Sequence, residues 1–164
     1  MTRWGIGPKL VGLSALLASP LLVARAIWAD AFAIHFAPRL VTTIAGSLLL
    51  AAGIPFCASA MRTLHRGFPK GELFTGGVYG FCRNPIYASW IVFLVPGIFL
   101  LLSSWLFALV PLAMYAALRL TIHREEAWLE TTFGEKYRAY RERVPAVLPV
   151  PRWKGRRSPA SPQR

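Results

Sequence analysis

Long apolar runs separated by short polar and basic segments dominate the sequence. The run from Leu40 to Met61 contains no charged residue, and a helix of that length at ~1.5 Å per residue spans the ~30 Å hydrocarbon core of a bilayer. The run from Leu10 to Trp28 is also long enough, with Arg25 near its end, where a long side chain reaches the headgroups. We therefore predict membrane-spanning helices over 10–28 and 40–61.

The first run also has some features of a signal peptide. Arg3 and Lys9 precede it, and Ala18-Ser-Pro20 faintly resembles a cleavage region. Because the apolar character continues past that point to Trp28, a retained helix is the favoured interpretation.

The third run, from Ile86 to Leu118, has 33 uncharged residues. As one helix it would measure ~50 Å, which exceeds the hydrocarbon core. Two crossings that turn near Ser103 and Ser104 fit better, with Pro96-Gly97 bending the first. Arg83 and Arg119 make both ends of this hairpin basic, and the positive-inside rule then places them in the cytoplasm. We predict an all-α, polytopic integral membrane protein with four spans and both termini inside, by default in a prokaryotic inner membrane.

Beyond the hairpin, apolar side chains recur near the helical period and predict a cytoplasmic amphipathic segment at the membrane surface. They are Trp128, Leu129, Phe133, Tyr137, Tyr140 and Val144. Gly134 should divide this segment into two helices, and Pro145 and Pro149 should end the second. Residues 151–164 have little to bury, which indicates a basic disordered tail after a single domain over 1–150.

Composition and charge narrow the choice of partner. Hydrophobic residues make up 55% of the chain and charged residues 16%, a balance typical of membrane proteins, with mean hydropathy +0.45. The net charge of +12 lies in segments that flank the apolar runs, which favours anionic membrane lipids over nucleic acid as the partner. Cys57 and Cys82 lack the spacing of a metal site or redox pair, and we expect no disulfide.

Two polar segments flank the predicted hairpin, over residues 76–87 and 123–130. A hairpin brings its two ends to the same side of the membrane. The Gly-rich loop at Gly76–Gly80, an arginine, an asparagine and tyrosines would therefore meet adjacent carboxylates at the lipid boundary. Glycines permit backbone conformations in which several N–H groups converge on an anion.

The same two segments resemble the isoprenylcysteine carboxyl methyltransferase-like and phospholipid methyltransferase group of membrane enzymes. The first carries Gly77-Val-Tyr79 followed by Arg83-Asn84-Pro85-Ile-Tyr87. The second runs from Glu125-Glu126-Ala-Trp-Leu129 through Phe133-Gly134-Glu-Lys-Tyr137 to Val144-Pro145. Together they cover roughly residues 70–149. Val78, Ser89 and Ala146 depart from the family's usual Pro, Gly and Arg.

The resemblance implies a methyltransferase that uses S-adenosylmethionine and a lipophilic or lipid-linked acceptor, with the cofactor-binding part over about 70–149. The cofactor-binding residues carried over from the family pattern are Gly77, Tyr79, Arg83, Asn84, Pro85, Tyr87, Glu125 and Glu126. We assign the two glutamates to the ammonium or ribose of the cofactor, and Arg83 with the Gly76–Gly80 backbone to its carboxylate. Tyr79, Tyr87 and Trp128 would pack on the adenine or sulfonium. No catalytic acid or base is identified.

Simpler interpretations of these residues exist. The two glutamates would also suit a solvated helix start beside Arg119 and Arg124, and Arg83 would also anchor the hairpin at the headgroups. The tyrosines and Trp128 equally fit an interfacial aromatic belt. His123 and Glu126 share a helical face, but no third ligand is evident, so we expect no metal.

Two alternative functions belong to other classes. A membrane reductase of the sterol-reductase type would bind a nicotinamide cofactor on a similar C-terminal architecture. A non-catalytic membrane module would keep the fold and bind neither ligand. Cofactor affinity separates the three hypotheses.

Overall fold

A computed structural model describes residues 7–67 and 73–147, and every regular element in those ranges is a helix. The elements are α1 (Gly7–Ile27), α2 (Arg39–Gly67), α3 (Val78–Phe81), α4 (Pro85–Ala88), the π-helical turn η2 (Ser89–Leu94), α5 (Val95–Leu101), the 3₁₀ turn η3 (Trp105–Ala108), α6 (Leu109–Phe133) and α7 (Glu135–Arg143). The predicted all-α class is confirmed for these residues. Pro149 and the predicted tail over 151–164 lie outside them.

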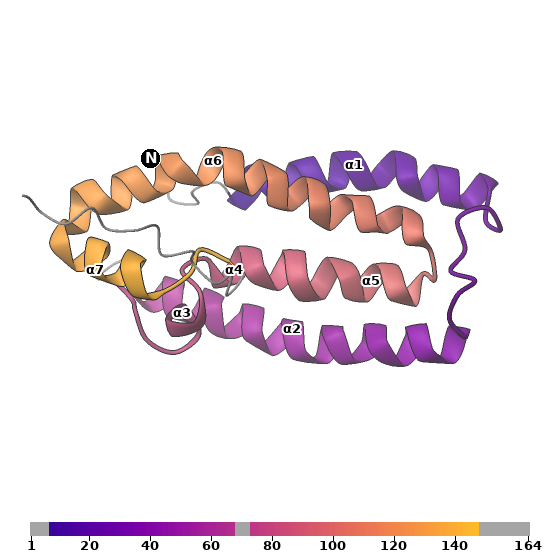
Figure 1. Cartoon of the computed structure of the whole chain (residues 1–164), viewed down its shortest axis with the longest axis horizontal. Coiled ribbons are helices and arrows are strands. Elements are labelled where there is room, and N and C mark those ends of the chain that lie inside the picture. Colours follow the sequence, from indigo (N-terminus) through magenta and orange to yellow (C-terminus); the bar gives the residue numbers. More distant parts are fainter. Residues whose placement is uncertain (1–6, 68–72, 148–164) are drawn as a thin grey trace, which may run out of the picture.

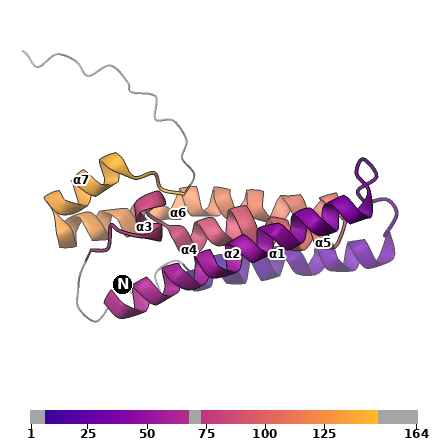
Figure 2. The ribbon, with the colours of Figure 1, turned by 90° about the horizontal axis from the view of Figure 1, so that it is seen from below.

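The long helices lie side by side in an elongated bundle (Figure 1). α1 packs along α6, and α2 packs along α5 and η2, so that α5 lies between α6 and α2. One end of the bundle holds the loop between α1 and α2 and the turn between α5 and α6. The other end holds α3, α4 and α7, as a second view also shows (Figure 2).

Two stretches of helix are long and apolar enough to cross a membrane, over Arg39–Arg66 and Trp105–Phe133. Two shorter apolar helices, Gly12–Ile27 and Pro85–Leu101, accompany them. α2 carries exposed large apolar side chains such as Leu40, Ile44 and Leu48, which suit a surface covered by lipid. These features support an integral membrane protein, while the count of four crossings stays a prediction.

Glycines allow α2 to pack closely against the first helix of the hairpin. A Cβ atom on Gly46 would lie 2.8 Å from the carbonyl oxygen of Gly97, and one on Gly53 would lie 2.5 Å from Cβ of Phe93. Small residues let helix backbones approach in membranes, where no hydrophobic force drives helices together. Gly46 and Gly53 therefore form a seam between these helices, whereas Ser47 and Ala51 on the same helix are exposed.

The predicted hairpin is confirmed, with α5 ending at Leu101 and the turn at Ser103 and Ser104. Ser103 has a φ of 48°, and Ser104 is fully buried in an antiparallel bridge to Ala33. Proline explains the irregular first helix, because Pro96 has no N–H to donate. Just before it, where η2 meets α5, the N–H of Val95 donates to the Trp90 carbonyl in π-helical register.

The C-terminal helices differ from the prediction of a separate interfacial segment. α6 continues without a break from the hairpin to Phe133, so its polar part extends the apolar part of the same helix beyond the bundle. Gly134, with a φ of 52°, ends α6 as predicted, and α7 folds back from it. Tyr137, Tyr140 and Val144 are buried against Leu129, Phe133 and Leu73. This apolar stripe therefore packs within the protein, and of the predicted set only Trp128 is exposed, at 43%.

Candidate active site

The loop between α3 and α4 is tied to the chain that follows α7. The backbone N–H of Arg83 donates to the Pro145 carbonyl at 2.9 Å, and that of Asn84 donates to the Ala146 carbonyl at 3.0 Å. The side-chain Nδ2 of Asn84 donates to the same Ala146 carbonyl at 3.0 Å. Segments about sixty residues apart in sequence thus meet at one end of the bundle, and their contact fixes the backbone of Arg83.

Arg83 and Glu126 form a buried ion pair at this meeting point. Nη1 of Arg83 lies 2.9 Å from Oε1 of Glu126, and the two side chains are 6% and 9% exposed. The same Nη1 donates to the Tyr137 hydroxyl at 3.3 Å, and Nη2 of Arg141 lies 3.7 Å from Oε2 of Glu126. Buried charges are tolerated when they are paired and hydrogen-bonded. Within residues 7–67 and 73–147, Nε of Arg83 has no hydrogen-bond partner.

Glu125 lies beside this pair on α6 and meets α4. The Tyr87 hydroxyl donates to Oε2 of Glu125 at 3.4 Å. Glu125 is partly buried, so the two adjacent carboxylates lie in different surroundings: one pairs with cations, and the other accepts from a neutral phenol. The end of the bundle therefore presents two carboxylates, a guanidinium and aromatic hydroxyls within one small region.

α7 supplies two members of the site that sequence reasoning did not assign to it. Because α7 folds back along α6 at Gly134, Tyr137 and Arg141 reach the Arg83–Glu126 pair. Glu130 stabilises this turn through ion pairs with Arg138, at 2.7 Å, and with Arg141, at 3.3 Å. The sequence carries a signal for this contact. Glu130 and Arg138 lie four residues before and four residues after Gly134, so a chain that folds back at Gly134 brings them together. Burial, and next the charge of Glu126, raise the pKa of Tyr137, which keeps its hydroxyl neutral.

Several other predicted site residues are engaged in contacts within the protein. The Tyr140 hydroxyl donates to the Tyr79 carbonyl at 2.6 Å, and the Tyr79 hydroxyl donates to the Ala60 carbonyl on α2 at 3.5 Å. Burial raises the pKa of Tyr79 to about 12. The side chain of Asn84 is engaged with Ala146, and Pro85 is fully buried as the first residue of α4.

Two backbone N–H groups of the Gly-rich loop are not available to bind an anion. Gly77 is exposed and has a φ of 59°, a conformation that favours glycine. The N–H groups of Tyr79 and Gly80 donate to the carbonyls of Gly76 and Gly77, so both are used inside the turn. Of the predicted residues, the structure brings together Arg83, Tyr87, Glu125 and Glu126. The remainder position the loop that carries Arg83.

The sequence matches the model of a protein family, phospholipid methyltransferase, over residues 41–136. That range is more than half of the chain and includes both members of the Arg83–Glu126 pair. The chain belongs to the phospholipid methyltransferase family. The predicted resemblance is thereby confirmed.

Curated relatives agree with this membership. The chain is 36% identical over 81 residues to a protein-S-isoprenylcysteine O-methyltransferase of Schizosaccharomyces pombe, covering 48% of this chain and 33% of the relative. It is 34% identical over 77 residues to the protein of the same name from Mus musculus, covering 47% of this chain and 27% of the relative. The matched part therefore spans about a third or less of each relative's length. No solved structure matches the chain.

Proposed function

We propose that this protein is an S-adenosylmethionine-dependent methyltransferase that acts on a lipophilic acceptor at the cytoplasmic face of the membrane. The observation that carries the proposal is the buried ion pair between Arg83 and Glu126. It joins the two motif-bearing segments, which lie largely within the family match, at one end of an apolar bundle. Isoprenylcysteine O-methyltransferases are among the relatives of this stretch.

The residues at this end fit the chemistry of the cofactor. S-adenosylmethionine supplies an electrophilic methyl group on a sulfonium, and its amino-acid part carries an ammonium and a carboxylate. Glu126 and Glu125 provide acceptors for the ammonium or ribose, and Arg83 provides donors for the carboxylate. The Nε of Arg83, buried and without a partner among the described residues, is a donor that a ligand can satisfy. Tyr87 adds aromatic surface beside the carboxylates.

In such a reaction the protein aligns the acceptor with the methyl group and excludes water from the site. The acceptor's nucleophilic atom forms a bond to the methyl carbon as the carbon–sulfur bond breaks. Holding both partners in line converts a bimolecular step into one within a complex, which can supply several kcal/mol of barrier reduction, roughly 7–11 at most. The Arg83 and Glu126 side chains are 6% and 9% exposed, and the exclusion of water around them strengthens the electrostatic interaction between their charges.

The proposal includes a topology. We infer four crossings, with the two shorter apolar helices spanning beside α2 and α6, and with both termini and the Arg83–Glu126 end in the cytoplasm. Arg62 and Arg66 lie in the last two turns of α2, whose C-terminal end is at this end of the bundle, consistent with the positive-inside rule. Anionic headgroups are the expected neighbours of these side chains. A prokaryotic inner membrane is the setting we favour.

Calorimetry on the detergent-solubilised protein tests the proposal. S-adenosylhomocysteine should bind, and a reduced nicotinamide dinucleotide should not. Glu126→Gln should weaken S-adenosylhomocysteine binding about ten- to a hundredfold, because a charged hydrogen bond contributes ~1.5–3 kcal/mol. Glu135→Gln is the matched control, since the Glu135 side chain is 85% exposed. It should bind as the wild type does.

Other outcomes would point to the alternative classes. Binding of the nicotinamide dinucleotide in place of S-adenosylhomocysteine would establish a reductase. A folded protein that binds neither would be a non-catalytic module. Transfer of labelled methyl groups from S-adenosylmethionine into an extractable lipophilic product is the activity readout that completes the test.

A further inference from the structure

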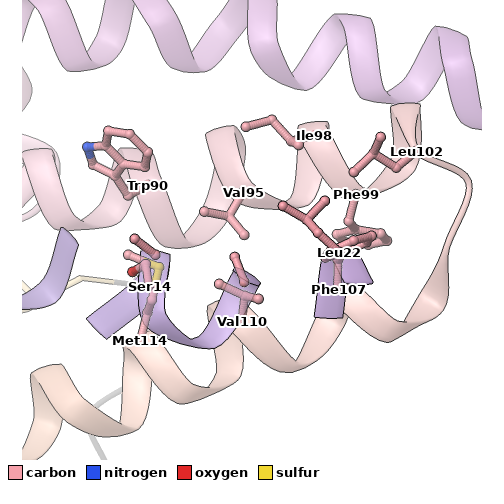
Figure 3. Close-up of a pocket in the computed structure, with 12 residues that line it drawn as sticks. Ser14, Leu22, Trp90, Val95, Ile98, Phe99, Leu102, Phe107, Val110 and Met114 are labelled. Carbon is pink, nitrogen blue, oxygen red and sulfur yellow. The ribbon is translucent and has the colours of Figure 1, made fainter. Parts of the chain in front are cut away.

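An apolar groove lies between α1, α5 and α6, with a volume of about 270 Å³ (Figure 3). Its wall on α6 includes the buried residues Phe107 and Val110. Leu22, Ile98 and Leu102 also line it and are themselves exposed, so the groove is closed toward α6 and open toward the surroundings of the bundle. Leu22 and Leu102 lie at the turn end, where the chain passes from α5 to α6 (Figure 3).

Arg25 lies at this open end of the groove. It follows Leu22 by three residues, in the last turn of α1. Its Nη2 donates to the carbonyl of Leu102, the residue after α5, at 3.4 Å. The side chain therefore reaches across from α1 to the end of α5 instead of extending away from the bundle. Since Leu22 and Leu102 both line the groove, the guanidinium lies beside its opening.

The charge of Arg25 is not balanced within residues 7–67 and 73–147. None of the ion pairs in that part of the chain includes Arg25. Its Nε is buried there without a hydrogen-bond partner. Its contact with the Leu102 carbonyl is longer than the about 2.7–2.9 Å of strong charge-assisted hydrogen bonds. A guanidinium at the edge of a hydrocarbon layer requires a charged acceptor, and phosphate matches the arrangement of its donors.

Two other features place Arg25 at the depth of lipid headgroups. Trp28 and Trp105 lie at the same end of the bundle and are both exposed, as aromatic side chains at a membrane–water interface are. A structural role explains only part of the arrangement. A cation in the last turn of α1 is favourable for the helix dipole, and Nη2 satisfies a carbonyl at the end of α5. Neither role uses Nε or fills the groove.

We propose that Arg25 and this groove bind one phospholipid from the bilayer leaflet at the turn end, with its phosphate on Arg25 and one acyl chain in the groove. The volume lies just below the ~300–1,000 Å³ of sites for drug-sized ligands, which suits part of one chain and not a whole lipid. The inference does not depend on the proposed methyltransferase chemistry.

A lipid at this place would hold α1 in the bundle. α1 packs on α6 and η3, and the groove lies between α1 and α5. A bound acyl chain fills that space, and the phosphate neutralises the side chain that links α1 to the end of α5. α1 also lies outside the family match over residues 41–136. The lipid site is therefore assigned to a part of this protein beyond the shared family segment.

Binding should require the phosphate and the chain together. Lipid tails in the bilayer are as apolar as the groove, so moving a chain into it gains little from the hydrophobic effect. The phosphate must then provide most of the preference for this place over bulk lipid. A single phosphate free in water lacks the chain that holds it at the opening. A lipid without phosphate, or a headgroup without chains, should therefore bind much more weakly.

Native mass spectrometry and thermal unfolding of the full-length protein in detergent test this with dioleoyl-phosphatidylglycerol. Diolein has the same chains without phosphate, and glycerol 3-phosphate has the phosphate without chains. The phosphatidylglycerol should bind with one lipid retained per protein and raise the unfolding temperature, and neither comparison compound should do so. Arg25→Gln should weaken phosphatidylglycerol binding about fivefold, the scale of one basic side chain at a lipid surface. Arg39→Gln is the matched control, because Arg39 is exposed at the same end and does not line the groove.

A second variant tests the groove and leaves Arg25 in place. Leu22→Trp should fill the opening and weaken phosphatidylglycerol binding, whereas Leu16→Trp on the same helix should not, because Leu16 is exposed and does not line the groove. Affinity for S-adenosylhomocysteine should stay the same in all four variants, which separates loss of the lipid from loss of the fold and of the proposed function.

Several outcomes would overturn the lipid site. Equal stabilisation by diolein would mean that Arg25 does not recognise the phosphate, and equal stabilisation by glycerol 3-phosphate would mean that the groove takes no chain. Equal losses in Arg25→Gln and Arg39→Gln would reduce the effect to general surface charge. Displacement of the bound phosphatidylglycerol by a long-chain N-acetyl-S-alkylcysteine would assign the groove to the methyl acceptor instead.

Discussion

The two ends of the helical bundle solve the same problem in different ways. Each end must satisfy the polar groups where helices stop and loops begin. At the hairpin turn, these groups are satisfied without an ion pair among the described residues: the hydroxyls of Thr42 and Ser103 lie 3.0 Å apart, the Ile34 N–H donates to the Ser103 carbonyl, and Nη2 of Arg25 donates to the Leu102 carbonyl at 3.4 Å. At the other end, α6 and α7 bury the Arg83–Glu126 ion pair and surround it with tyrosines.

The turn end joins helices, whereas the Arg83–Glu126 end also carries groups suited to bind a charged cofactor. The hydrogen bonds at the turn have hydroxyl and carbonyl oxygens as acceptors, so they close this end of the bundle at little electrostatic cost. A buried ion pair carries a desolvation penalty that apolar residues of similar volume would avoid. Among the described residues, Nε of Arg83 and Nε of Arg25 at the turn end both lack a hydrogen-bond partner, so the feature that distinguishes the candidate site is the buried ion pair itself. The charged end is therefore where function is expected.

Breaking the ion pair should have the largest effect. Arg83→Met leaves Glu126 buried with only the more distant Arg141, and loss of one partner of such a pair costs ~3–5 kcal/mol of unfolding free energy. The double variant Arg83→Met with Glu126→Met removes both charges and should recover most of that stability. S-adenosylhomocysteine binding should be lost in both variants. Thermal unfolding and calorimetry in detergent measure the two quantities.

The turn supplies the control for that experiment. Thr42→Val removes the hydroxyl contact with Ser103 and should cost about 1 kcal/mol without changing S-adenosylhomocysteine affinity. If the charge-free double variant binds S-adenosylhomocysteine as the wild type does, the ion pair is structural and the contrast between the two ends is wrong.

Gly46 and Gly53 on α2 pack closely against α5 and η2 between the two ends. Disturbing this packing should have the next largest effect on stability. A methyl group on Gly46 would lie 2.8 Å from the Gly97 carbonyl oxygen, which belongs to the backbone and cannot rotate away. Gly46→Ala should therefore push α2 from α5 and cost ~1–3 kcal/mol. In α1, Gly12 has no heavy atom within 4 Å of such a methyl group. Gly12→Ala should stabilise the helix by roughly 0.5–1 kcal/mol, and thermal unfolding that ranks the two variants alike would contradict close packing at the seam.

A variant of Asn84 tests the distinction between residues that bind the ligand and residues that position the loop. Its side chain donates to the Ala146 carbonyl, so Asn84→Ala should cost about 0.5–1.5 kcal/mol of stability. We expect only a small loss of S-adenosylhomocysteine affinity, because the Asn84 backbone N–H still holds the same carbonyl. A loss as large as that of Glu126→Gln, in a protein of near-normal stability, would return Asn84 to the cofactor site.

The sequence could predict the features that depend on neighbouring residues along the chain. Uncharged runs predicted the helices, the length of the run over 86–118 predicted a hairpin, and Gly134 predicted the end of α6. The motif residues Arg83 and Glu126 were predicted to meet because a hairpin joins its ends, and they do.

Features that depend on how α7 packs could not be predicted from the sequence. The period of Tyr137 and Tyr140 indicated an amphipathic helix, but periodicity does not say whether its apolar face meets lipid or protein. Once α7 folds back, Tyr137 meets Arg83, and Arg141 meets Glu126. Asn84 and Tyr79 have side chains suited to either a ligand or a backbone carbonyl, and only tertiary contacts decide between these partners.

Cysteine labelling tests which end faces the cytoplasm, with the smallest disturbance to the protein. Ala31 lies in the exposed loop at the turn end, and Glu135 lies at the start of α7 with its side chain 85% exposed. Ala31→Cys should react with an impermeant maleimide on intact cells, and Glu135→Cys should react only after permeabilisation. Native thiols add little background, because Cys57 and Cys82 are buried, and burial raises the pKa of Cys82 to about 11. Since the thiolate is the reactive form, Cys82 should react slowly at neutral pH and faster as the pH rises toward 11, again only after permeabilisation. Reversed labelling would place the Arg83–Glu126 end outside the cell, away from cytosolic S-adenosylmethionine, and would remove the proposed topology.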